Sequence, residues 1–214
     1  DITGFYRDVK GQIQMARQNL NSTAQNASAY NYFQNGDFAT TKGLEFVFKL
    51  RRTNRLRSEL YYTMSDARGS GSTTAAGLSG IENDSNVPTI ISPLDFNETH
   101  RGSLYFDYRF GEDDGGPIFS ELGANLLFRF SSGHNFTFSE GSLGQTGPED
   151  GGLLNSTDPR TRKPLESVNR STTPWTFQLD LRVDKGFNLM GLEAKAYTYI
   201  ENLLDRQNVL NVYQ

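Results

Sequence analysis

One pattern recurs seven times along this chain: about ten residues with apolar side chains at every second position, followed by a polar break. The clearest copy is residues 101–110, where Leu104, Phe106, Tyr108 and Phe110 alternate with side chains that are mostly polar. A period of two places successive side chains on opposite faces of a β-strand. The pattern therefore predicts seven strands, each with one apolar and one polar face.

The first strand has the least regular alternation. Phe5, Val9, Ile13 and Met15 are predicted to share an apolar face, which Arg7 interrupts. The other strands alternate more regularly. The seven strands are predicted at residues 3–15, 41–51, 56–65, 101–110, 121–131, 174–184 and 192–202.

The breaks between the strands alternate strictly between long and short. Long breaks are expected at about 19–38, 66–99 and 132–173, and short turns at about 52–55, 111–119 and 187–191. Because neighbouring strands of such a sheet run antiparallel, all long breaks lie on the same side. This asymmetry is typical of outer-membrane β-barrels, whose long loops are extracellular and whose short turns are periplasmic.

A water-soluble sandwich is the main alternative, since it can also expose a charged strand face. The loop asymmetry favours the barrel, with outer-membrane lipid as the partner of the apolar faces. Hydrophobic residues make up 36% of the chain and the mean hydropathy is −0.58, so no membrane-spanning helix is expected. A net charge of −4 gives no signature of nucleic-acid binding.

Seven strands are an odd number, and an open sheet edge facing lipid leaves backbone groups without partners. We therefore expect residues 1–214 to be one part of an outer-membrane barrel that other sequence completes. The start at Asp1, within a predicted strand, also indicates an incomplete piece of a longer polypeptide.

Five short motifs, in order along the chain, resemble those of TonB-dependent outer-membrane receptors, most closely the Oar-like branch. They are KGLE at 42–45, YYTMSDA at 61–67, DFNETHR at 95–101, DKGF at 184–187 and ENLLDRQNV at 201–209. The resemblance implies a 22-stranded barrel with a plugged lumen, of which this chain is roughly strands fifteen to twenty-one. It also implies uptake of a bulky nutrient driven by TonB in the periplasm, although this chain contains neither a plug nor a TonB box.

Two other functions remain open. The same barrel could be a surface anchor or scaffold whose loops hold partner proteins, such as a surface lipoprotein, without active uptake. It could also be a small adhesin barrel of the eight-stranded type. The substrate of a transporter is not encoded in any recognisable pattern of the loops.

No enzymatic, cofactor or metal site is predicted. His100 and His134 are the only histidines, and neither belongs to a zinc-binding helix motif. The acidic residues at 112–114 and 149–150 are interpreted as solvated turn and loop charges rather than calcium ligands. N-x-S/T sequons at Asn21, Asn26, Asn97, Asn135, Asn155 and Asn169 are interpreted as loop composition.

Overall fold

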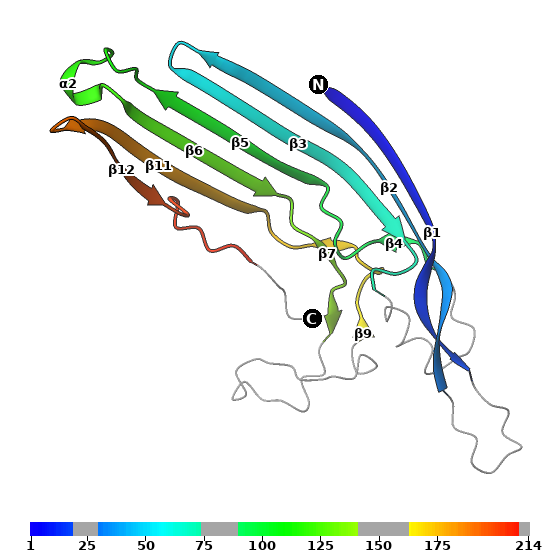
Figure 1. Cartoon of the computed structure of the whole chain (residues 1–214). Helices are drawn as coiled ribbons and strands as arrows, with labels where there is room; N and C mark the ends of the chain where they lie inside the picture. The colour runs from blue at the N-terminus through cyan, green and yellow to red at the C-terminus, as the bar shows by residue number, and fades with distance from the viewer. Residues whose placement is uncertain (19–29, 74–89, 141–162, 210–214) are drawn as a thin grey trace, which may run out of the picture.

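The computed structural model describes residues 1–18, 30–73, 90–140 and 163–209, most of which form one antiparallel sheet (Figure 1). No helix in these four ranges is long and apolar enough to cross a membrane. The seven long strands are β1 (Ile2–Gln18), β2 (Tyr30–Thr53), β3 (Leu56–Gly69), β5 (His100–Arg109), β6 (Leu122–Ser131), β11 (Thr176–Leu189) and β12 (Leu192–Ile200).

Each long strand pairs with its neighbours in the sequence, in the order β1-β2-β3-β5-β6-β11-β12, so β1 and β12 are the edges. The turn after β2 is Asn54-Arg55 and the turn after β11 is Met190-Gly191. Asn54, Met190 and Gly191 adopt positive φ angles, as tight hairpin turns require. All short connections lie at one end of the sheet and the long ones at the other (Figure 1).

All three short connections differ from the prediction. Residues 52–53 belong to β2 rather than to the following turn. The segment between β5 and β6 contains a one-turn helix, α2 (Gly116–Phe119), instead of only a turn. Residues 187–189 belong to β11 rather than to the following turn. The differences at residues 52–53 and 187–189 lie at strand ends, which alternation locates poorly.

The first long loop was predicted too long. β2 begins at Tyr30, and its residues 30–35 pair with residues 13–18 of β1. Residues 30–38 are therefore strand rather than loop, and β1–β2 extends past the sheet as a twisted hairpin (Figure 1). Residues 19–29 of the predicted loop lie outside the described residues. The prediction failed because a polar stretch can extend a β-strand when the neighbouring strand, here β1, offers backbone hydrogen-bond partners.

The predicted face of the first strand was also wrong. Phe5 pairs with Gly43 and Val9 with Ala39, which places Phe5 and Val9 on the face that carries Glu45. The Phe5 ring lies over Gly43, where a side chain would occupy the same space. The pairing is irregular between Lys10 and Ile13, so the alternation does not continue unbroken into the hairpin.

The described parts of the other two long loops contain short strand pairs. β4 (Ser92–Pro93) pairs with the end of β3. β7 (Asn135–Phe136) pairs with β10 (Ser171–Thr172), and β8 (Ser139–Glu140) with β9 (Lys163–Pro164). Residues 66–69 extend β3, contrary to the prediction. Residues 74–89 and 141–162 lie outside the described part of the chain.

From β2 to β12 the apolar faces merge into one surface, which we call the apolar face. Leu44 pairs with Met64, Leu60 with Leu104, Leu104 with Phe128, Phe128 with Leu179, and Leu181 with Ile200, each pair pointing to the same side. We predict from the alternation that residues 104, 106, 108 and 110 form one surface with residues 122, 126, 128 and 130. Those within β5 and β6 lie on this face, and Phe110 follows the end of β5. Within the described ranges no second sheet or long helix covers this face (Figure 1).

The burial of side chains is inverted relative to a water-soluble domain. Asp180 and Leu94 are the large side chains that are fully buried, whereas Leu44, Phe46 and Phe48 are exposed. The buried apolar cluster consists of Ala39, Ala67 and Leu94, near the long loops. Large contiguous apolar surfaces mark binding or membrane contact in folded proteins. The apolar face therefore needs an apolar environment outside the described residues.

Candidate functional site: the polar face of the sheet

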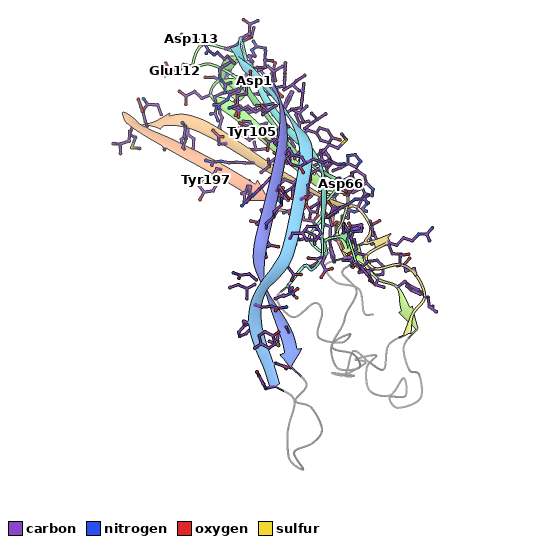
Figure 2. The ribbon with its side chains drawn as sticks, turned by 90° about the vertical axis from the view of Figure 1, so that its right-hand side faces the viewer. Asp1, Asp66, Tyr105, Glu112, Asp113 and Tyr197 are labelled. Atoms are coloured by element: carbon purple, nitrogen blue, oxygen red, sulfur yellow. The ribbon has the colours of Figure 1, made fainter. Side chains whose placement is uncertain are left out.

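The opposite side of the sheet, which we call the polar face, carries charged side chains from every long strand from β2 to β11. The register brings Lys49 opposite Glu59 and Arg57 opposite Asp107. Figure 2 shows that the sheet curves, with Tyr105 and Tyr197 on its inner side and Asp66 on its outer side. The polar face thus lines the inside of the curve, as the wall of a hydrated lumen does.

Near the short turns, an ion pair spans three strands. The Arg109 guanidinium on β5 donates to both carboxylate oxygens of Asp184 on β11, at 2.7 and 2.9 Å. β6 lies between them and presents Gly123 in the same row. A Cβ at this position would lie 2.6 Å from the Arg109 guanidinium carbon, so glycine keeps the path open. Bidentate pairs of this kind combine attraction with geometric specificity.

Near the long loops, Asp180 organises a second group. Its carboxylate accepts hydrogen bonds from Arg129 at 2.6 Å, from Gln178 at 3.0 Å and from the backbone N–H of Asn202 at 3.0 Å. Asp180 is 2% exposed, and its three donors compensate the loss of water. Arg129 uses one terminal nitrogen for this contact, and half of its side chain stays exposed.

A hollow of about 490 Å³ lies beside this group, lined by residues of β3, β5, β6 and β11 and by Asn208. Tyr61, Arg101, Arg129 and Gln178 are among its lining residues. The Tyr61 hydroxyl donates to Glu59 at 2.9 Å, which orients the ring. Guanidinium, hydroxyl and amide groups in one hollow can hydrogen-bond water and polar ligand groups, and none of them forms a catalytic arrangement.

Three sequon asparagines form a buried network that joins the long loops. Asn97 accepts a hydrogen bond from the Ala67 backbone N–H and donates to the Asn135 side chain, at 2.8 and 2.9 Å. Asn135 donates to the Asn169 carbonyl at 2.9 Å, and Asn169 donates to the Pro93 carbonyl at 2.8 Å. All three asparagines are buried. Their role here is to hold the loop bases together, a role that the sequence interpretation missed.

The segment after β12 was also missed as a structural element. Asn208 donates to the Phe177 carbonyl and accepts from the Phe177 N–H, at 2.9 and 3.0 Å. The Leu203 N–H donates to the Leu179 carbonyl at 2.7 Å. Residues 202–208 therefore bond the part of β11 that extends beyond the end of β12. The signal was the motif at 201–209, whose Asn208 side chain and Leu203 N–H supply these bonds.

The two histidines make contacts with different residues. His100 begins β5, and its Nδ1 lies 2.7 Å from the Tyr62 hydroxyl, with its ring stacked on Trp175. His134 donates its backbone N–H to the Thr173 hydroxyl at 3.0 Å. Within the described ranges no group of three or more His, Cys, Asp or Glu side chains could hold a metal ion.

The acidic turn at 112–114 is tied to the neighbouring turn. Arg55 makes a bidentate contact with Asp114, with its Nε at 2.5 Å from one carboxylate oxygen. The hydrogen bond from Arg55 holds the pKa of Asp114 below its usual value. The acidic residues at 149–150 lie outside the described residues.

Aromatic side chains gather at both ends of the apolar face. Trp175 stacks on His100, Phe130 and Phe177 at the end with the long loops, with ring centroids 5.6 to 6.4 Å apart. Phe110 stacks on Phe119 of α2 at the end with the short turns. Two such aromatic belts bounding an apolar band are a feature of membrane β-barrels.

No protein-family model matches the chain, and no curated protein matches it. Among solved structures, the chain is similar to the outer membrane transporter YddB from Escherichia coli, with a TM-score of 0.51 and 14% sequence identity. The match covers 97% of this chain and 26% of that one, so the chain spans about a quarter of the transporter's length. The fold is therefore an all-β antiparallel sheet of about seven strands that matches a quarter of a larger outer-membrane barrel.

Proposed function

We propose that this chain forms part of the wall of a TonB-dependent outer-membrane transporter that imports a bulky nutrient. The observation that carries the proposal is the division of one sheet into an uncovered apolar face and a polar face linked by ion pairs. Lipid on one side and a hydrated lumen on the other satisfy both faces. The likeness in fold to an outer membrane transporter supports the same assignment.

The sheet edges support a larger barrel. β1 and β12 each have one long neighbour, and the free edge of each strand presents backbone groups that need partners. In hydrocarbon each unsatisfied backbone group costs several kcal/mol, so membrane sheets close into barrels. We propose that strands outside these 214 residues complete the barrel, as in a transporter about four times as long. The long loops are then extracellular and the short turns periplasmic.

The proposal is tested with the full-length protein in its own cells. An outer-membrane location is expected on fractionation, together with a band in gel electrophoresis that migrates differently before and after boiling. Growth on candidate nutrients should depend on both this gene and tonB if uptake is active. Deletion of the gene with no growth defect on any nutrient would refute the transport assignment, and uptake that persists without TonB would refute its TonB dependence.

A surface scaffold is the second candidate, and one feature favours it. The β1–β2 hairpin extends past the sheet and exposes Tyr30 and Phe33, with 52% and 66% of each side chain's reference surface exposed. Exposed aromatic side chains are typical anchors of protein interfaces. Two measurements separate the candidates. The scaffold predicts a surface lipoprotein that co-purifies with the wild type but not with a Tyr30→Ser/Phe33→Ser variant, and no nutrient uptake by the wild type. Nutrient uptake by the wild type supports the transporter.

A further inference from the structure

An apolar groove crosses β1, β2 and β3 on the apolar face, near the end with the long loops. Its volume is about 630 Å³. Gly4, Tyr6, Lys42, Leu44 and Met64 line it. None of these residues belongs to the hollow of the polar face, so the groove is a separate feature of the outer surface.

The groove exists because Gly4 leaves a gap in the surface. Gly4 pairs with Leu44, and Leu44 pairs with Met64, so the three form one row across the sheet. A Cβ added at Gly4 would meet the Leu44 Cδ2 atom at 3.6 Å, an ordinary contact, and nothing closer. The floor is therefore open to a chain of CH₂ groups, and a larger side chain at position 4 would fill it without displacing neighbours.

The rim of the groove carries a positive charge. Lys42 is the cross-strand partner of both Tyr6 and Asp66. The Nε of Arg68 lies 3.1 Å from both Asp66 oxygens, which occupies that carboxylate. The Lys42 ammonium is 3.8 Å from Asp66, beyond hydrogen-bond distance, and 65% of its side chain is exposed. Lys42 thus lies in the row next to Gly4, Leu44 and Met64, and its ammonium, held only in this long ion pair, remains open to a further anion.

We propose that this groove binds a membrane lipid with an anionic phosphate headgroup. Its acyl chain lies along Gly4, Leu44 and Met64, and its phosphate contacts the Lys42 ammonium and the Tyr6 hydroxyl. An apolar trough flanked on one side by a cation and a hydroxyl matches a lipid, whose chain and charge are joined side by side in the same way. The inference rests on the proposed membrane location of the apolar face.

The test measures bound lipid by native mass spectrometry of the full-length protein in detergent. Dipalmitoyl phosphatidylglycerol is the probe, and dipalmitoylglycerol, which has the same chains and no phosphate, is the comparison. Phosphatidylglycerol should bind to the wild type. The K42Q variant should bind it with about fivefold lower affinity, the factor that corresponds to about 1 kcal/mol per basic residue. G4L should reduce binding further by filling the trough. K195Q, which removes a lysine from the polar face of β12, should leave binding unchanged.

Three outcomes would overturn the proposal. They are equal binding of both lipids, unchanged binding in K42Q, and displacement of phosphatidylglycerol by excess inorganic phosphate, which would indicate a simple anion site. The band shift on boiling is recorded for each variant, so that a protein that is not a folded barrel is recognised separately. If the wild-type protein shows the band shift but does not bind the lipid, only the proposed lipid site is contradicted. If the wild-type protein shows no band shift, the proposed barrel function is contradicted.

Discussion

Arginine at Leu126 and at Leu127 should have opposite consequences, although the two residues are adjacent on β6. Leu126 lies on the apolar face between Phe106 and Leu181. Leu127 lies on the polar face, with Asp180 as its partner on β11. With the proposed membrane location, the same substitution therefore places a guanidinium in lipid in one variant and beside a carboxylate in a hydrated lumen in the other.

The expected loss of stability depends on the depth of the substituted residue in the membrane. The apolar side chains of β6 run from Leu122 to Phe130, about 27 Å along the strand at roughly 3.4 Å per residue. With a strand tilt of about 40°, this covers roughly 20 Å of the membrane, and Leu126 is the midpoint. Arginine at the midplane of a membrane barrel costs about 2–4 kcal/mol. Leu127→Arg should cost less than about 1 kcal/mol, since it loses little burial and gains an acidic neighbour.

The measurement is the free energy of unfolding of each variant of the complete barrel in lipid vesicles, from reversible guanidinium titrations. Wild type and Leu127→Arg should have similar midpoints, and Leu126→Arg a clearly lower one. Equal losses, or a greater loss for Leu127→Arg, would show that the two faces have been assigned to the wrong environments. A difference of the same size for the protein in the absence of a lipid bilayer would exclude lipid as its cause.

Three further outcomes follow from contacts outside the apolar face. Because Arg55 lowers the pKa of Asp114, the stability difference between wild type and Asp114→Asn should be complete above about pH 4. This difference, measured by denaturant titration at each pH, should disappear as the pH falls through the lowered pKa of Asp114 in the folded state. Maleimide should label Thr73→Cys on intact cells and Asp113→Cys only after the outer membrane is broken; the reverse pattern would invert the topology. Asn169→Ala should cost about 1–3 kcal/mol through unsatisfied buried groups and speed loop proteolysis, and unchanged proteolysis would argue against the network.

Alternation predicted the strands from β2 to β12 because each has unlike environments on its two faces. It failed on β1, where Phe5 lies on the polar face and Tyr6 on the apolar one. Phe5 is accommodated there because its cross-strand neighbour is Gly43, whose missing side chain makes room for the ring. A single strand does not reveal its partner's residues, so this exception could not be predicted from β1 alone.

The loop network was beyond prediction for a different reason. Asn97, Asn135 and Asn169 each stand in loop-like sequence, and polar loop residues are usually solvated. Their burial depends on contacts between segments 30 or more residues apart, which no local pattern encodes. The polar face was easier, because charges of both signs recur at every second position of several strands. The hollow there could not be foreseen, since its shape depends on the register.

The ion pairs of the polar face also specify that register. In a sheet one layer thick, a slip of one residue between neighbouring strands moves every side chain of a strand to the other face. For β5 such a slip would place Arg109 toward lipid and leave Asp184, which is 4% exposed, without its partner. The pair spans β6 at Gly123, so one contact fixes three strands at once. The charged residues therefore select the correct pairing, because a slip of one residue would separate the paired charges and expose one of them on the apolar face.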